Sequence, residues 1–290
     1  MPRTHPAALT LILLAVIACT GCESVQKALE SLDKPTARIQ DVRLRDLTLQ
    51  NVTLHFDVEV SNPYKVDLPL TRVDYALATT GKSFLDGEAD LSGTIPARGS
   101  RTVTLPASIR FEELIQAVKD VRLGQVLPYK ADLALSVDGS AVPGIPGGGT
   151  IRLPVSKQGK LPVPNVPKVE LTDVRWSKLD LTEASAVIQL RVENTNEFPV
   201  DLSSLGYQLS LGDTLVADTT IDKSINFAPG KAQTIELPLR VAPANLGLAL
   251  LRTLTQGSAK YDLSGSMSGQ TPFGPIDLPF NRAGTTKMGR

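Results

Sequence analysis

Cysteine, histidine and tryptophan are scarce in this chain, whose 290 residues contain two Cys, two His and one Trp. Both cysteines, Cys19 and Cys22, lie near the N-terminus, so the body of the protein can hold neither a disulfide framework nor a thiolate metal site. His5 belongs to the N-terminal segment, which leaves His55 as the one histidine for chemistry in the body. Nucleophile–histidine catalysis and histidine metal centres are therefore restricted to a single position.

The chain also lacks an excess of charge of either sign, because thirty basic residues balance thirty acidic ones. It contains no Lys/Arg run that would attract a polyanion locally. Nucleic acid is therefore not an expected partner. The longest apolar run, Ala7 to Ala18, is too short to cross a bilayer core about 30 Å thick as a helix.

That apolar run has the properties of an export signal. Arg3 supplies the positive charge that precedes such a segment, which predicts a signal peptide over residues 1–22. A small residue directly before Cys resembles the bacterial lipobox, where the new N-terminal Cys carries lipid. Gly21 before Cys22 favours Cys22, while Ala18 before Cys19 fits the pattern as well, so Cys19 is the alternative. A cleaved signal without lipid is the competing interpretation.

Residues 23–37 are interpreted as a tether between the lipid and the folded body. A solvated spacer is preferred over a short helix with one apolar face that ends before Pro35. The expected product is a lipid-anchored protein of the bacterial cell envelope, in the inner or outer membrane, on the periplasmic side or at the surface.

The rest of the chain repeats itself, since residues near 40–155 recur near 170–283 in the same order at an almost constant shift. The recurring positions are mostly apolar strand positions and turn residues. They are Asn62, Tyr75, Leu105-Pro106, Leu114 and Tyr129 in the first copy, and Asn194, Tyr207, Leu237-Pro238, Leu246 and Tyr261 in the second. Duplication therefore preserved a fold rather than a catalytic set.

Each copy begins with an alternating strand, because residues 52–60 place apolar side chains on one face and polar ones on the other. Residues 184–192 repeat the pattern with smaller inward side chains, so the two cores cannot be packed identically. Each strand ends in a polar turn in which Asn62 or Asn194 can satisfy nearby backbone groups. Further strands are expected at residues 84–95, 101–105, 129–137 and 151–155 and at their equivalents in the second copy.

Periodicity switches to that of a helix once per copy. Phe111, Leu114, Ile115 and Val118 share one helical face, and residues 246–254 repeat this spacing. We therefore predict two tandem antiparallel β-sandwiches, each with one α-helix, at residues 38–158 and 168–283. A Pro-rich linker occupies residues 159–167, and residues 284–290 form a polar tail.

The order of these motifs resembles the group 2 late-embryogenesis-abundant domain, also called the water-stress and hypersensitive-response (WHy) domain. The resemblance rests on Asn62-Pro63, Leu68-Pro69-Leu70, residues 95–99 and the ending at residues 271–280. It implies immunoglobulin- or fibronectin III-like sandwiches that are folded when hydrated, and no catalytic residues. The second copy departs from the pattern with Asn194-Thr195, and the first inserts residues 142–149.

The remaining candidates for chemistry have simple structural interpretations. His55 faces outward beside Asp57 and Glu59, which favours a solvated strand face over a base or ligand. The run at residues 147–149 is a flexible hairpin rather than a phosphate loop, and Trp176 is expected in the core or between the copies. No catalytic, metal or cofactor-binding residues are predicted.

Two classes of function remain. In the first, a tethered, non-enzymatic binding or protective module presents its surfaces to envelope proteins or lipids under stress such as desiccation. In the second, a groove between sheet and helix holds a lipid or another hydrophobic ligand. An enzyme is the least favoured class.

Overall fold

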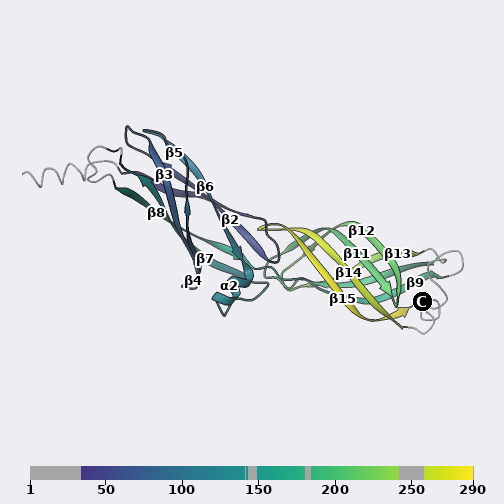
Figure 1. Cartoon of the computed structure of the whole chain (residues 1–290). Coiled ribbons are helices and arrows are strands. Elements are labelled where there is room, and N and C mark those ends of the chain that lie inside the picture. The colour runs from purple at the N-terminus through teal and green to yellow at the C-terminus, as the bar shows by residue number, and fades with distance from the viewer. Residues whose placement is uncertain (1–33, 141, 143–148, 180–183, 242–257, 290) are drawn as a thin grey trace, which may run out of the picture.

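The computed structural model describes residues 34–140, 142, 149–179, 184–241 and 258–289, which form two β-rich bodies placed end to end (Figure 1). Copy 1 spans residues 36–162 and copy 2 spans residues 168–289. The expected mainly β, tandem fold is confirmed. The elements of copy 1 are β1 (Thr36–Arg45), β2 (Asn51–Ser61), β3 (Leu68–Thr79), β4 (Lys82–Asp90), β5 (Thr94–Ile95), β6 (Ser100–Arg110), α2 (Phe111–Ala117), β7 (Val126–Asp138) and β8 (Thr150–Pro162). Those of copy 2 are β9 (Lys168–Leu179), β10 (Ala184–Glu193), β11 (Val200–Leu211), β12 (Thr214–Phe227), β13 (Ala232–Val241), β14 (Ser258–Thr271) and β15 (Gly274–Gly289).

Copy 1 is built from two antiparallel sheets, one in the order β1-β2-β6 and the other in the order β4-β3-β7-β8, with β5 paired to β3. The inward side chains of β2 are fully buried, as the alternation of its sequence predicts. They are Val52, Leu54, Phe56, Val58 and Val60. The sandwich therefore has its core between these two sheets.

The predicted helix of copy 1 is present as α2, which follows β6 directly. Phe111, Leu114 and Val118 are buried, and Ile115 is partly buried, so the predicted apolar face is the one that packs on the core. Residues 246–254, where the second helix is expected, lie outside the described residues.

Copy 2 differs from copy 1 in that its strands form one continuous sheet, in the order β12-β11-β14-β15-β9-β10-β13. The sheet is continuous because the end of β15 pairs in parallel with β9, with Lys287 opposite Asp173. Residues 284–289, expected as a polar tail, belong to this strand, and Thr286 is buried. The tail prediction was wrong because it considered polarity alone, whereas β14 supplies backbone partners as far as Lys287.

The two cores are packed differently, as the smaller inward residues of the second copy predict. In copy 1 Leu44 lies opposite Leu54, and in copy 2 Trp176 lies opposite Ala186. The large indole thus occupies space that the alanine leaves free, which preserves the packed volume. Trp176 is buried in the core of copy 2, and its Nε1 has no hydrogen-bond partner among the described residues.

Three strand boundaries differ from the sequence expectation. Residues 84–95 form two strands, β4 and β5, because the chain bends at Gly93, whose φ is +116°. β8 continues to Pro162, so the extended linker is limited to residues 163–167. At the N-terminal side Pro35 is buried and Thr36 already belongs to β1, so the tether ends before residue 35.

The junction between the copies is held by hydrogen bonds on both sides of the linker. Asn165 N–H donates to Asn196 Oδ1 at 2.7 Å, and Asn196 Nδ2 donates back to the Asn165 carbonyl at 3.2 Å. The Gly124 carbonyl accepts from Glu197 N–H at 2.7 Å, while Gly124 N–H donates to Val163 at 2.6 Å. The turn of copy 1, the linker and the Asn194 loop of copy 2 therefore form one bonded unit.

The same unit explains the departure from Asn-Pro in the second copy. Thr195 donates its hydroxyl to the Val166 carbonyl at 2.8 Å, which the proline found at the equivalent position of copy 1, Pro63, could not do. Gly124 has φ +91°, and a Cβ there would lie 2.5 Å from the Thr195 carbonyl oxygen. Glycine is thus required at position 124 for two reasons: its positive φ, and the close approach of the Thr195 backbone of copy 2.

We expect Asn196→Ala to loosen the orientation of the two copies without unfolding either, because it removes both hydrogen bonds to Asn165. Small-angle X-ray scattering of the full chain should show a broader distribution of interatomic distances, with an unchanged far-UV circular dichroism spectrum. Tyr64→Ala, at the equivalent position of copy 1, is the control and should leave the distribution unchanged. An identical distribution for Asn196→Ala would contradict a bonded junction.

The signal peptide, both cysteines of the lipobox and nearly all of the tether lie outside the described residues. Among the residues that the structure describes, no helix has the length and apolarity needed to cross a bilayer.

Candidate functional site

The outer face of β2 carries the charged residues noted in the sequence, and the structure pairs each with an arginine. Asp57 accepts from the Thr104 hydroxyl at 2.6 Å and from Arg43 at 2.5 Å. The Thr104 hydroxyl and then the Arg43 guanidinium hold the pKa of Asp57 below its usual value. Glu59 pairs with Arg38 at 2.8 Å. These carboxylates are therefore occupied in cross-strand pairs.

His55 lies on the same outer face, opposite Arg43 on β1 and Pro106 on β6. It is partly exposed, as expected for a solvated strand face. Within the described ranges, no group of three His, Cys, Asp or Glu side chains could hold a metal ion. In copy 2, Arg191 lies 3.8 Å from Glu193, again as a surface ion pair.

The repeated asparagines hold the backbone of both copies from inside. Asn62 is 2% exposed, and its Nδ2 donates to the carbonyls of Val66, Ile95 and Pro96. Asn194 is 3% exposed and donates to the carbonyls of Phe198 and Phe227. The side-chain role expected from the sequence is confirmed, and it is structural.

Three of the four repeated tyrosines lie with their rings against glycines on the neighbouring strand. A Cβ added to Gly87 or Gly159 would lie 2.6 Å from the hydroxyl oxygen of Tyr75 or Tyr129, and one added to Gly284 would lie 3.0 Å from that of Tyr261. In each pair the ring covers the space that the missing side chain leaves on the sheet. Burial raises the pKa of Tyr129.

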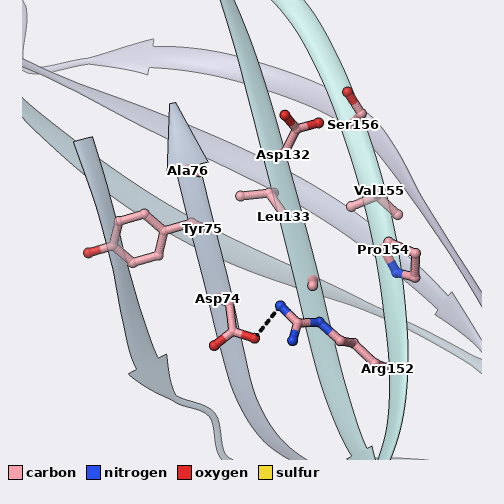
Figure 2. Close-up of a pocket in the computed structure, with 10 residues that line it drawn as sticks. Asp74, Tyr75, Ala76, Asp132, Leu133, Arg152, Pro154, Val155 and Ser156 are labelled. Carbon is pink, nitrogen blue, oxygen red and sulfur yellow. Dashed lines mark ion pairs between the residues drawn. The ribbon is translucent and has the colours of Figure 1, made fainter. Parts of the chain in front are cut away.

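A hollow of about 420 Å³ lies on the outer face of the second sheet of copy 1, across β3, β7 and β8 (Figure 2). The residues that line it include the small or flat side chains of Ala76, Ala134 and Pro154. Its polar lining residues are Asp74, Asp132, Arg152 and Ser156. Arg152 lies 2.8 Å from Asp74 Oδ2, and Lys130 lies 2.8 Å from Asp132. Figure 2 shows the Asp74–Arg152 pair on one side and Asp132 with Ser156 on the other. With both carboxylates paired, the hollow offers a contact surface rather than reaction chemistry.

A second, more apolar crevice of about 250 Å³ opens between the two sheets of copy 1, where β4 and β6 are both edge strands. Its walls include Phe56, Val73, Leu91, Leu105, Ala107 and Leu133. The crevice lies between the two sheets, whereas the sequence expectation was a groove between sheet and helix. A separate hollow of about 530 Å³ does lie beside α2, lined by residues that include Leu49, Phe111, Ile115 and Leu123. Sequence reasoning missed the crevice between the sheets, although Ala89, one of its lining residues, stands where copy 2 has Ile221.

This arrangement defines a class: a tandem, mainly β protein in which duplicated residues maintain the fold and the surface offers places for contact. The family model LEA_2, described as "Late embryogenesis abundant protein", matches residues 57–159 and 189–284. Because these segments cover more than half of the chain, the protein belongs to this family.

Two curated relatives align with about half of this chain. Desiccation-related protein At2g46140 of Arabidopsis thaliana is 26% identical over 138 residues, which are 48% of this chain and 80% of that protein. Late embryogenesis abundant protein Lea14-A of Gossypium hirsutum is 25% identical over 136 residues, 47% of this chain and 86% of that protein. A solution structure of At2g46140.1 is 23% identical, covering 56% of this chain and 95% of that one, with a TM-score of 0.38.

Proposed function

We propose that this protein is a membrane-tethered, non-enzymatic binding or protective lipoprotein of the group 2, or WHy, type. Its two sandwiches present contact surfaces to proteins or lipids of the bacterial cell envelope under stress. The proposal rests on the kind of residue that recurs in both copies. The residues that recur in both copies, Asn62 with Asn194 and Tyr129 with Tyr261, act on backbone and packing rather than on a substrate.

The link to desiccation comes from the names of relatives, two of which are a desiccation-related protein and a desiccation protectant. A protective protein must stay folded while it contacts many partners, and a rigid β-sandwich suits that role. Catalysis is not part of the proposal, since the candidates His55, Asp57 and Glu59 lie on a solvated strand face, and both carboxylates are paired with arginines.

Protection can be measured by drying and rehydrating a desiccation-sensitive enzyme in the presence of the full chain. We expect more enzyme activity to survive than with the same mass of serum albumin, because the chain remains folded and shields exposed apolar surface of the enzyme. Survival equal to that with albumin would contradict a specific protective role.

The tether proposal rests on Cys19 and Cys22 after the apolar segment. Each buried CH₂ of an acyl chain contributes about 0.8 kcal/mol, so two or three chains hold a protein on a membrane durably, whereas one chain is marginal. We expect Cys19→Ser with Cys22→Ser to move the protein from the membrane to the soluble fraction and to abolish palmitate labelling. The two single variants identify the modified residue, with Cys22 as the expected site. Palmitate labelling that survives the double substitution would refute the lipid anchor.

A second candidate function is hydrophobic-ligand binding, which the apolar crevice of copy 1 favours. Mass spectrometry of natively extracted protein should then detect a co-purified lipid. Protein that carries none would count against this candidate and would leave the protective role unaffected.

A further inference from the structure

Two positions beside the crevice of copy 1 are small where copy 2 has isoleucine. Val73 and Leu205 are equivalent, since each lies two residues before the repeated tyrosine, Tyr75 or Tyr207. Val73 pairs with Ala89 on β4, whereas Leu205 pairs with Ile221 on β12. The methyl group of Ala89 thus stands where copy 2 places a whole isoleucine side chain.

A second position shows the same difference. Leu202 of copy 2 pairs with Ile225, while the equivalent Leu70 of copy 1 donates its N–H to the carbonyl of Gly93. Ile221 and Ile225 pack against the core of copy 2, and β12 lies against β13 along that side. In copy 1 the equivalent place is the crevice between β4 and β6, which we call the seam. It stays open, and Ala89 remains exposed although it faces inward.

The chemistry of the seam decides what it can hold. An extended peptide would add to the free edge of β6, and strand addition needs backbone donors along that edge. Pro106 lines the crevice on β6 and has no N–H to donate. A hydrocarbon chain needs no hydrogen bonds, and it would gain from leaving water for walls such as Phe56 and Leu133.

Charge distinguishes the two ends of the seam. Asp90 lines the crevice itself and would repel an anionic group placed there. Arg101 lies three residues along β6 from Thr104, about 10 Å at the usual rise of a strand. Its guanidinium lies over Gly93, where an added Cβ would be 2.6 Å from Nη1, and it donates to the Thr94 carbonyl. Among the described residues, no carboxylate forms an ion pair with Arg101.

We propose that the seam between β4 and β6 of copy 1 binds one saturated or unsaturated acyl chain, with its carboxylate directed to Arg101. This inference rests on the second candidate function and names its site and ligand class. The volume of about 250 Å³ suits a segment of one chain rather than a two-chain lipid, because pockets for larger ligands measure about 300–1,000 Å³.

The test measures binding of laurate and of dodecanol to the full chain by isothermal titration calorimetry. Ala89→Ile installs the copy 2 residue in the seam and should weaken binding of both probes by about tenfold or more. Asp86→Ile, which adds the same side chain to the outer face of β4, is the matched control and should leave binding unchanged. Thermal unfolding of each variant identifies any loss of fold.

Arg101→Gln should weaken laurate about three- to fivefold, as for an exposed ion pair, and leave dodecanol unchanged. Arg101→Lys should restore most of the laurate affinity, and Lys82→Gln, which removes a cation at the far end of β4, should have no effect. Equal loss for both probes in Arg101→Gln would overturn the carboxylate assignment.

Binding that Ala89→Ile does not weaken would overturn the seam as the site while keeping hydrophobic-ligand binding. If neither laurate nor dodecanol bound, both the seam as the site and hydrophobic-ligand binding would be overturned.

Discussion

Gly159→Val is expected to destabilise copy 1 by about 3 kcal/mol, at the upper end of the range for overpacked cores. An added Cβ would lie 2.6 Å from the Tyr129 hydroxyl oxygen and 2.7 Å from its ring. Tyr129 is only 4% exposed, so its ring has no solvent into which it can move. The change must therefore force apart β7 and β8, which pair along their whole length. Chemical denaturation of the full chain measures the loss.

Gly87→Val on β4 is the matched control, because its Cβ would also lie 2.6 Å from a tyrosine hydroxyl oxygen, that of Tyr75. Tyr75 is partly exposed and lies beside the edge strand, so it can rotate away, and we expect a smaller loss of about 1 kcal/mol. Combining Gly159→Val with Tyr129→Ala should show a favourable coupling energy, since the clash is removed. Equal losses for the two glycines would contradict the role assigned to burial of the ring.

Asn194→Ala is expected to cost about 3 kcal/mol in copy 2, because several buried partners lose their hydrogen bonds together. Its Nδ2 donates to the Phe198 carbonyl at 2.8 Å and to the Phe227 carbonyl at 3.1 Å, and its Oδ1 accepts from Asn196 N–H at 3.0 Å. Water cannot replace a side chain that is 3% exposed without reaching the interior. Hydrogen exchange followed by mass spectrometry of the full chain should place the loss of protection in copy 2.

Asn62→Ala provides the comparison within the same molecule. It removes equivalent bonds in copy 1, so a similar loss of stability is expected there. Only Asn194→Ala should also loosen the junction, since Asn194 holds Asn196, which binds the linker. An equal change in the orientation of the copies for both variants would contradict the bonded junction.

The sequence predicted those parts of the fold that depend on local pattern. Period-two alternation located β2, and helical spacing located α2, because inward and outward positions follow directly from backbone geometry. It could not predict the parallel pairing of β15 with β9, which joins the two ends of copy 2, because no local pattern marks residues so far apart in the sequence as neighbours. It also could not predict the break at Gly93, which divides one expected strand into β4 and β5.

Prediction of the candidate site was limited for a related reason. A crevice is defined by missing volume, and Ala89 or Gly93 alone resembles any small residue in a strand. The missing volume is recognised only when Ala89 is compared with Ile221 of copy 2, and Gly93 with Ile225. The repeated tyrosines align these positions in the sequence, but only the strand register shows that Ala89 and Ile221 face the equivalent core residues Val73 and Leu205.

The closure of copy 2 by β15 has a consequence for a crowded or drying environment. Because β9 pairs with β15, the described strands of copy 2 form one sheet with two edge strands, β12 and β13, whereas the two sheets of copy 1 have four edge strands, β1, β6, β4 and β8. Copy 2 thus offers neighbouring molecules fewer edges with unpaired backbone on which to build an intermolecular ladder. When water is withdrawn and molecules are pressed together, we therefore expect copy 2 to form fewer intermolecular strand pairs than copy 1.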